Sequence, residues 1–292
     1  LKNNVRGILL ENESMSKHTS YGIGGKVRGY ITPNDVEDLI KIINIINKNN
    51  LKFYFVGSGS NLLVNDKDIN AIIVTPSKSL KSLSINKNTI NAESGVMLGR
   101  LVKEAIKRNL TGLESLVGVP GTLGGALMMN AGAWGSEISN YLVSVDVINT
   151  DGKMKTLNPQ DIEFKYRYSS FKSSDFILSA KFRLKKASKV EIEKKKLIAS
   201  KGRINSQPLK FRSAGSVFKN PHNKLAAGLL IDMAGLKGAR HGGAEISTHH
   251  ANFFINHGDA KANDIANLIR LSRKTVYEKF GIMLELEIKT IG

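Results

Sequence analysis

The sequence contains no cysteine. Disulfide bonds, thiolate nucleophiles and cysteine-ligated metal sites are therefore excluded, and we expect a cytoplasmic location. No apolar run approaches the roughly 20 residues that a membrane-crossing helix needs. The early apolar segment Ile8–Leu10 is also far too short for the core of a secretion signal. We therefore expect no membrane insertion.

Metal-ligand spacings are lacking as well. The four histidines near the C-terminus, His241, His249, His250 and His257, form no H-E-x-x-H pair and lie in no cluster of carboxylates. We expect no bound metal, and we assign these histidines to structural roles or to substrate contacts.

Acidic residues are few relative to basic ones: 25 Asp and Glu against 43 Lys and Arg give a net charge of +18. Such an excess fits nucleic acid, an anionic membrane surface or anionic small ligands. No compact basic block carries interleaved aromatics, and the densest run, Lys194–Lys196, lies in a mixed-charge helical pattern typical of a solvated face. We therefore expect no nucleic-acid partner. A non-catalytic nucleotide- or RNA-binding protein is kept as a third interpretation, supported by charge alone.

Hydrophobic residues make up 41% of the 292 positions, which is enough for a folded core and for two domains. A shift in composition places a domain boundary at Lys185–Lys189. Apolar spacing predicts helices over 36–46, 96–109, 187–202, 225–234 and 264–280. Strands are expected over 53–56, 69–74, 89–92, 143–148, 154–157, 176–184, 251–256 and 283–289.

Glycine is concentrated in a charge-free stretch, Gly118–Gly135, which holds six glycines among 18 residues. Because glycine lacks a Cβ, such backbone can reach positive φ, lie close to a bound group and offer its N–H groups to an anion. The same residues equally fit a tight turn followed by a small-residue buried helix over 124–130. This stretch alone leaves both interpretations open.

A second glycine-rich loop, Gly57–Val64, directly follows a predicted strand, where phosphate-binding loops occur. It is not a dinucleotide fingerprint, because Leu62 takes the place of the third glycine, and no Gly-Lys-Ser/Thr makes it a Walker loop. Ser58, Ser60 and Asn61 nevertheless add hydroxyl and amide groups beside flexible backbone.

Arg167 lies between Tyr166 and Tyr168. Two aromatic neighbours can aim a guanidinium at a carboxylate or an enolate. An arginine packed on surface rings explains the motif better when it is taken alone.

Two further motifs carry groups suited to acid–base chemistry. Ser216 lies at the start of a predicted strand. Its hydroxyl is placed to donate a proton, but Ser216 is equally explained as an ordinary loop serine without a catalytic role. Glu285 and Glu287 share one face of the last predicted strand, and by themselves they are explained as solvated carboxylates.

Together these motifs resemble the UDP-N-acetylenolpyruvoylglucosamine reductase (UDP-N-acetylmuramate dehydrogenase) family. The resemblance covers nearly the whole chain from Thr19 to Gly292 and depends on the order and spacing of its segments. They are Val56–Leu63, Gly118–Gly125, Asn130–Ala133, Tyr166–Ser169, Ala214–Pro221 and Leu284–Ile288.

The resemblance implies an α+β fold in which an FAD-binding domain of the vanillyl-alcohol-oxidase (PCMH) type precedes a smaller α+β substrate-binding domain. The FAD-binding region is expected over 1–185, as two subdomains of about 1–75 and 76–185. The substrate-binding domain is expected over 186–292, with Glu287 on its final strand.

The activity implied by the resemblance is reduction of the enolpyruvyl ether of UDP-N-acetylglucosamine enolpyruvate to UDP-N-acetylmuramate, in peptidoglycan precursor synthesis. NADPH reduces non-covalently bound FAD, which then reduces the UDP-sugar. The family's catalytic arginine, proton-donating serine and catalytic glutamate fall on Arg167, Ser216 and Glu287. Its contacts to the substrate fall on Tyr166, Lys219 and Asn220.

The family's FAD contacts fall on the loop 19–25 and on the two glycine-rich stretches. The residues concerned are Tyr21, Gly57, Ser58, Gly59, Ser60, Asn61, Leu62, Gly118, Pro120, Gly121, Thr122, Gly124, Gly125, Asn130, Ala131 and Gly132.

The chain departs from the family pattern at Leu286 and Lys289, where proline and arginine are common, and at Phe211–Arg212, where Tyr-Pro is common. The short interval between Arg167 and Ser216 resembles the form of the family that lacks an extra substrate-covering loop. An FAD-dependent alcohol oxidase on the same scaffold is the alternative. Many such oxidases attach FAD through His or Cys, which the loop Gly57–Asn61 lacks.

Overall fold

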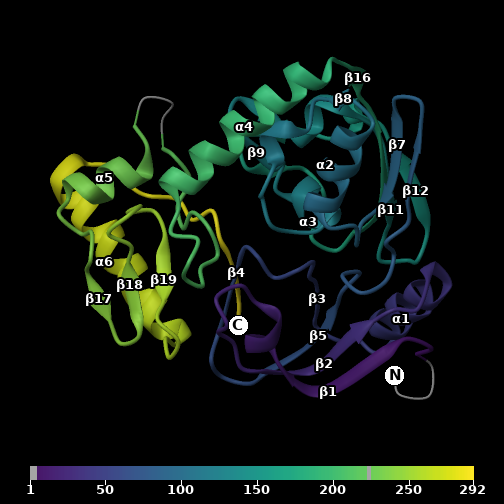
Figure 1. Cartoon of the computed structure of the whole chain (residues 1–292). Coiled ribbons are helices and arrows are strands. Elements are labelled where there is room, and N and C mark those ends of the chain that lie inside the picture. The colour runs from purple at the N-terminus through teal and green to yellow at the C-terminus, as the bar shows by residue number, and fades with distance from the viewer. Residues whose placement is uncertain (1–4, 222–224) are drawn as a thin grey trace. The chain divides into compact units, whose positions relative to one another are not determined.

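The computed structural model describes residues 5–221 and 225–292, which fall into two compact units (Figure 1). Unit 1 comprises Leu1–Asn12, Arg28–Ser58 and Asn70–Gly202. Unit 2 comprises Glu13–Val27, Gly59–Ile69 and Arg203–Gly292, so two early segments join the C-terminal part of the chain. The domain limits expected from the sequence, 1–185 and 186–292, stay a prediction.

A four-stranded sheet packs with helix α1 through one hydrophobic cluster. Its strands lie in the order β1 (Ile8–Ser14), β2 (Lys26–Thr32), β5 (Ile69–Val74) and β3 (Phe53–Phe55). Helix α1 (Val36–Lys48) buries its apolar side through Leu39, Ile42, Ile43 and Ile46. Asp35 begins the helix, because its carboxylate accepts a hydrogen bond from the Asp38 N–H at 2.9 Å.

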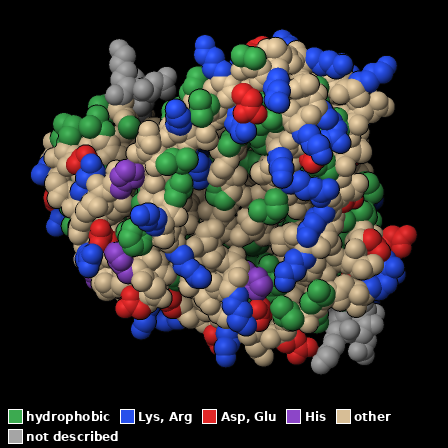
Figure 2. All heavy atoms as spheres, viewed as in Figure 1, with side chains coloured by type: hydrophobic (Ala, Val, Ile, Leu, Met, Phe, Trp, Pro, Cys, Tyr) green, Lys and Arg blue, Asp and Glu red, His purple; other side chains and the backbone are tan. Residues whose placement is uncertain are grey.

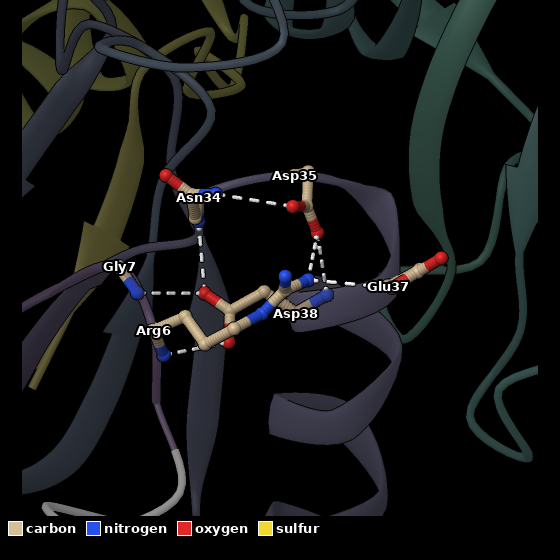
Figure 3. Close-up of polar contacts among 6 residues, drawn as sticks. All are labelled: Arg6, Gly7, Asn34, Asp35, Glu37 and Asp38. Atoms are coloured by element: carbon tan, nitrogen blue, oxygen red, sulfur yellow. Dashed lines mark hydrogen bonds and ion pairs between the residues drawn. The ribbon is translucent and has the colours of Figure 1, made fainter.

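The first turn of α1 is fastened to an earlier part of the chain by Asp38, whose side chain is fully buried. Its carboxylate accepts hydrogen bonds from the backbone N–H groups of Arg6, Gly7 and Asn34 at 2.9, 2.9 and 2.8 Å (Figure 3). Three donors on one carboxylate offset the cost of burying its charge. Asp38 therefore stabilises both the helix and the approach of residues 6–7 to it.

Unit 1 also contains a five-stranded antiparallel sheet in the order β12-β11-β15-β7-β6. Helices α2 (Leu98–Lys107) and α3 (Leu123–Met128) lie on one side of it and share its hydrophobic cluster (Figure 1). The strands are β6 (Leu83–Asn86), β7 (Thr89–Glu93), β11 (Leu142–Ile148), β12 (Met154–Leu157) and β15 (Phe176–Arg183). The strands predicted over 143–148 and 154–157 are confirmed, and they pair with each other as an antiparallel hairpin.

The C-terminal part of unit 2 is a three-stranded sheet packed with two helices. Strands β17 (Arg240–His241), β18 (Ala244–Ile246) and β19 (Phe254–Asn256) lie in that order. Helices α5 (Ala227–Met233) and α6 (Ala262–Phe280) bury their apolar sides in the same cluster. Helix α6 ends at Gly281, which adopts the left-handed conformation at φ 68° that favours glycine. Strand β4 (Leu62–Val64) pairs in parallel with β20 (Lys289–Ile291).

The remaining elements are short, apart from helix α4 (Lys189–Ser206). They are β8 (Leu110–Thr111), β9 (Gly132–Ala133), β10 (Ser136–Glu137), β13 (Phe164–Lys165), β14 (Tyr168–Ser169), β16 (Lys185–Lys186) and the 3-10 helices Met15–His18, Glu114–Leu116, Ile138–Tyr141 and Pro159–Asp161. Across the described residues, no helix combines the length and the apolar character needed to cross a membrane.

The strand expected over 283–289 is wrong. Regular pairing begins only at Lys289, and residues 283–288 form one isolated bridge, between Phe218 and Leu286, with a few further backbone hydrogen bonds. The alternation in burial survives, because Leu284 and Ile288 are buried whereas Glu285 is exposed. Burial of alternate residues therefore does not require a continuous sheet partner.

Candidate functional site

Within unit 1, the start of the glycine-rich loop Gly57–Val64, here called the first glycine-rich loop, contacts the glycine-rich stretch Gly118–Gly135. A Cβ on Gly57 would overlap Thr122 Oγ1, so only glycine fits at this approach. The carbonyl of Gly57 accepts a hydrogen bond from the Thr75 hydroxyl at 3.3 Å. Thr122 in turn begins α3, where its Oγ1 accepts a hydrogen bond from the Gly125 N–H at 3.4 Å. Two stretches far apart in the sequence thus meet at Gly57 and Thr122.

The turn before α3 requires its glycines. Gly118 and Gly121 have φ values of 74° and 133°, which side-chain-bearing residues rarely adopt. The Leu98 N–H donates to the carbonyl of Gly121 at 2.9 Å, and the Gly124 N–H donates to the carbonyl of Ser94 at 3.0 Å. The stretch therefore forms the tight turn and small-residue helix that the sequence allowed. The helix, α3, spans Leu123–Met128, whereas it was expected over 124–130.

Protein packing does not account for Gly125. This residue is exposed, and a Cβ there would meet only Thr122 Oγ1 at 3.6 Å, an ordinary contact distance. Alanine is also the better helix former. Bare backbone at an accessible position instead fits a ligand that approaches the main chain closely.

Two polar atoms on the two glycine-rich stretches are buried and have no hydrogen-bond partner within the described residues: Ser58 Oγ and Asn130 Oδ1. Asn130 has φ 42°, and its Nδ2 donates to Glu137 Oε2 at 2.6 Å and to the carbonyl of Lys165 at 3.1 Å. An unpaired buried polar atom costs about 1–3 kcal/mol. Both atoms, together with the glycine turns, fit a large polar group such as FAD that supplies the missing hydrogen bonds.

Within unit 2, the loop 19–25 lies against the rest of the first glycine-rich loop. The Ser20 N–H donates to the carbonyl of Gly59 at 3.1 Å. Gly59 has φ 68°, and a Cβ there would overlap the His18 carbonyl oxygen. Tyr21 is fully buried, its carbonyl accepts from Asn256 Nδ2 at 2.8 Å, and burial raises the pKa of its phenol. The Tyr21 hydroxyl therefore stays neutral at ordinary pH.

Arg167 lies at the tip of a two-residue hairpin in unit 1, between β13 and β14. Its φ of 55° is left-handed, whereas Tyr166 has no positive φ, which is the pattern of a type II turn. The guanidinium carbon lies 5.0 Å from the centre of the Tyr166 ring, a cation–π contact. The hairpin is held to the end of the glycine-rich stretch, because Ser169 Oγ donates to the carbonyl of Met128 at 2.7 Å. The turn that presents Arg167 is thus fixed from both sides.

Ser216 and Glu287 lie on neighbouring backbone segments of unit 2. The Glu287 N–H donates to the carbonyl of Val217 at 2.8 Å, and the Lys219 N–H donates to the carbonyl of Glu285 at 2.8 Å. Both Ser216 and Glu287 are half-buried. The pairing of residues 217–219 with 285–287 therefore places the backbone that follows Ser216 beside the backbone of Glu287.

Asn61, in the first glycine-rich loop, forms hydrogen bonds with the segment that contains Glu287. Its Nδ2 donates to the carbonyl of Glu287 at 3.2 Å, and its own carbonyl accepts from the Lys289 N–H at 3.0 Å. The loop that follows β3 thus continues directly into the pairing that holds Glu287.

Sequence reasoning missed Asn252, which supports this segment from the other side. Its side chain is buried, Oδ1 accepts from the Phe218 N–H at 2.9 Å, and Nδ2 donates to the Phe218 carbonyl at 2.8 Å. The backbone carbonyl of Asn252 accepts from the Val217 N–H at 2.8 Å. The Asn252 side chain therefore satisfies both backbone groups of Phe218, as a paired strand would. In the sequence, Asn252 is recognisable only as a polar residue inside an apolar run, and this pattern alone does not indicate that its side chain holds a neighbouring segment.

The expected substrate contacts have partners within unit 2 or lie at the surface. Lys219 Nζ forms an ion pair with Glu285 Oε1 at 2.6 Å, with the lysine largely buried and the glutamate exposed. Asn220 is exposed, and its Oδ1 accepts from the Ala227 N–H at 3.0 Å at the start of α5. Tyr166, in unit 1, is 45% exposed. Asn220 thus has a structural role whatever else it contacts.

The other expected cofactor residues differ in exposure. Ser60 and Leu62 in unit 2 and Ala131 and Gly132 in unit 1 are half-buried, whereas Pro120 is exposed.

Of the four histidines near the C-terminus, His241 and His257 contact carboxylates, His250 is half-buried and His249 is exposed. His257 Nε2 lies 3.0 Å from Glu245 Oε2, and His241 Nδ1 lies 3.1 Å from Asp264 Oδ1. Burial lowers the pKa of His250. In the part of the chain that the structure describes, no three His, Asp or Glu side chains are grouped to hold a metal ion.

Comparisons with known proteins agree with this arrangement. Residues 27–158 match the family model described as FAD binding domain, and residues 207–291 match the model described as UDP-N-acetylenolpyruvoylglucosamine reductase, C-terminal domain. The UDP-N-acetylenolpyruvoylglucosamine reductase of Caldicellulosiruptor bescii is 44% identical over 286 residues, covering 97% of this chain and 90% of the relative. That of Carboxydothermus hydrogenoformans is 40% identical over 293 residues, covering 100% and 97%.

A solved structure is similar over nearly the whole length of both chains. The crystal structure of UDP-N-acetylenolpyruvylglucosamine reductase from Thermus caldophilus has a TM-score of 0.82 and 32% sequence identity. It covers 98% of this chain and 99% of its own.

Proposed function

The chain belongs to the UDP-N-acetylenolpyruvoylglucosamine reductase family, and on that premise we propose which of its residues carry the reaction. It is an FAD oxidoreductase of peptidoglycan precursor synthesis that reduces UDP-N-acetylglucosamine enolpyruvate to UDP-N-acetylmuramate with NADPH. The expected α+β fold, with an FAD-binding domain before the C-terminal domain, is confirmed.

FAD is held by the two glycine-rich stretches and the loop 19–25 in this proposal. Ser58 Oγ and Asn130 Oδ1 supply hydrogen bonds to it, since both are buried without a partner in the described chain. The bare backbone at Gly125 lets the cofactor approach. When bound, FAD supplies the hydride chemistry that links NADPH to the enolpyruvyl ether.

Ser216 donates the proton that completes reduction of the carbon–carbon double bond. Hydride addition to the vinyl CH2 carbon leaves negative charge on the adjacent carbon and its carboxylate. A serine hydroxyl is a weak acid, and this carbanion is basic enough to accept its proton. The alkoxide that remains needs a polar neighbour to stabilise it.

Arg167 and Glu287 stabilise the developing enolate. Arg167 does so by charge, from a hairpin tip whose backbone is already fixed. Glu287 does so by hydrogen bonding in its protonated form, which exclusion of water by bound substrate favours. Fixed groups need no rearrangement as the charge develops, which is the main source of electrostatic catalysis.

Tyr166, Lys219 and Asn220 contact the UDP-sugar, and Lys219 is the proposed cation for its diphosphate. The ion pair with Glu285 orients the Lys219 ammonium before substrate arrives. We also propose a cytoplasmic location, because NADPH and UDP-sugars are metabolites of that compartment.

The observation that supports this proposal is the pairing of residues 217–219 with 285–287, because the segment that directly follows Ser216 lies beside the segment of Glu287. The test separates the two half-reactions of Ser216→Ala under anaerobic conditions. We expect NADPH to bleach the flavin as in the wild type, and substrate to reoxidise it about 10²–10⁴ times more slowly. Ser213→Ala, three positions earlier, serves as the control. A Ser216→Ala variant with an unchanged second half-reaction would show that the proton comes from elsewhere.

A further inference from the structure

The outward face of helix α4 leaves apolar side chains uncovered. Ile192 and Ala199, each 1% exposed, lie on the buried side of the helix. Helical spacing places Val190 and Leu197, which are seven residues apart, on the opposite side. Val190, Leu197 and Ile198 are 80%, 51% and 55% exposed. Side chains this exposed stand out from the surface as a ridge and do not line a groove.

Lysines share this face. Lys194 and Lys201 lie on the same side as Val190 and Leu197, and both are exposed. Neither forms an ion pair with any carboxylate of residues 5–221 or 225–292. The two carboxylates of the helix are engaged by its other lysines, in ion pairs at 2.7 and 3.0 Å. The ridge is therefore flanked by positive charge that is not neutralised.

Trp134, the only tryptophan of the sequence, lies in the turn between β9 and β10, and its ring packs against α4. A Cβ on Gly202 would overlap its ring, so the indole rests directly on the backbone of α4. It is 55% exposed, and the residue it packs on, Gly202, lies about one helical turn after Ile198, on the flank of the outward face. An exposed indole beside apolar side chains and lysines is typical of surfaces at the boundary between lipid and water.

The positive surface continues beyond α4. Figure 2 shows Lys and Arg side chains gathered over the part of unit 1 that holds α2, β8 and β16. Lys195 of α4 reaches β8, where its Nζ donates to Thr111 Oγ1 at 3.1 Å. The exposed basic residues of this area are Arg100, Lys103, Lys107, Lys185 and Lys186. With the net charge of +18, they attract an anionic surface.

We propose that this face, made by Val190, Lys194, Leu197, Ile198 and Lys201 of α4 together with Trp134, binds an anionic lipid bilayer. The apolar side chains enter the boundary between headgroups and acyl chains, and the lysines extend to the phosphates. The protein lies on the membrane and does not cross it.

Charge and shape favour this occupant over two others. A second copy would bring the same lysines face to face, in two molecules that each carry +18. An acidic helix of another protein usually seats its apolar side in a groove. The protruding side chains of α4 suit a flat, deformable acceptor.

The test is binding of the full-length holoprotein to lipid vesicles. We expect it to sediment with phosphatidylcholine vesicles that contain roughly 30% phosphatidylglycerol, but not with phosphatidylcholine alone, and to be released by high salt. Trp134 reports the contact directly, since its fluorescence should shift to the blue and be quenched by shallow bromine-labelled lipid.

Matched variants separate this face from net charge alone. Lys194→Gln with Lys201→Gln should weaken binding about 25-fold, about five-fold for each lysine. Lys41→Gln with Lys48→Gln, on α1, removes the same charge and should change binding less than about two-fold. Leu197→Ser with Ile198→Ser should weaken binding at least about ten-fold, whereas the exposed Met154→Ser should have no effect. NADPH turnover without vesicles should be unchanged in all four, which shows that they fold.

Several results would overturn the proposal. They are equal losses from the two lysine pairs, absence of binding to anionic vesicles, and a dimer in solution that Leu197→Ser with Ile198→Ser disrupts. Binding to an acidic polypeptide such as polyglutamate, without binding to vesicles, would also overturn it. None of these results depends on the proposed roles of Arg167, Ser216 and Glu287.

Discussion

Substitution of Gly125 by alanine separates protein stability from cofactor binding. Gly125 is an exposed residue of α3, and its added Cβ would meet only Thr122 Oγ1 at 3.6 Å. Alanine keeps the backbone N–H that Thr122 accepts. Since alanine in a helix is favoured over glycine by roughly 0.5–1 kcal/mol, Gly125→Ala should leave the FAD-free protein as stable as before or slightly more stable.

The same Cβ should interfere with FAD. If the cofactor lies against the bare backbone at Gly125, one added methyl group must displace it or be accommodated with strain. Overpacking of this size costs about 1–3 kcal/mol, which corresponds to an increase in the FAD dissociation constant of about five-fold to 150-fold.

Gly99→Ala is the matched control. Gly99 is also an exposed helical glycine, in α2, and a Cβ there would meet nothing within 4 Å. We expect the same small gain in stability with unchanged FAD binding. Urea unfolding of the FAD-free proteins and fluorescence titration with FAD give the two quantities. Equal FAD affinities for the two variants, or a destabilised FAD-free Gly125→Ala protein, would refute the reasoning.

Three other perturbations have defined outcomes. Asp38→Asn should lower the free energy of unfolding by about 2–3 kcal/mol in urea titrations, because it removes the charge that three backbone N–H groups share; a loss below about 0.5 kcal/mol would contradict this. The hydrogen bond from the Asp38 N–H lowers the pKa of Asp35 in the folded protein. The stability that ionised Asp35 contributes is therefore fully present above the pKa of about 4 that Asp has in the unfolded chain, and it is lost as pH falls through the pKa of Asp35 in the folded protein. The stability difference between the wild type and Asp35→Ala should therefore shrink as pH falls below about 4, and a difference that grows there would be evidence against the assignment. Asn252→Leu should slow reoxidation of the flavin by substrate more than about ten-fold while flavin reduction by NADPH stays within about three-fold, since it releases the segment after Ser216; equal slowing of both would indicate a general structural defect.

Helices whose apolar residues recur with a clear helical spacing could be predicted from the sequence. The apolar spacing of α1 and α6 gave both helices, and the acidic start at Asp35 and the glycine at 281 mark their ends as the structure has them. Glycines that need positive φ, such as Gly118 and Gly121, also signalled a real turn. These signals are local, so they do not depend on the rest of the fold.

Features that depend on distant parts of the chain could not be predicted in the same way. Residues 283–288 alternate in burial like a strand, but their partner is the short segment after Ser216, so no regular sheet forms. Asn252 takes the place of a strand by two side-chain hydrogen bonds, which no spacing pattern records. The roles of Arg167, Ser216 and Glu287 came from the resemblance to a family, and they stay predictions.

The most direct test of the central claim is single-turnover reoxidation of the pre-reduced protein by UDP-N-acetylglucosamine enolpyruvate without oxygen. Arg167→Lys, Ser216→Ala and Glu287→Gln are compared with the wild type. The account predicts that each variant accepts electrons from NADPH within a few-fold of the wild-type rate but reoxidises at least about 100-fold more slowly. Reoxidation at the wild-type rate in any of the three would contradict the role given to that residue.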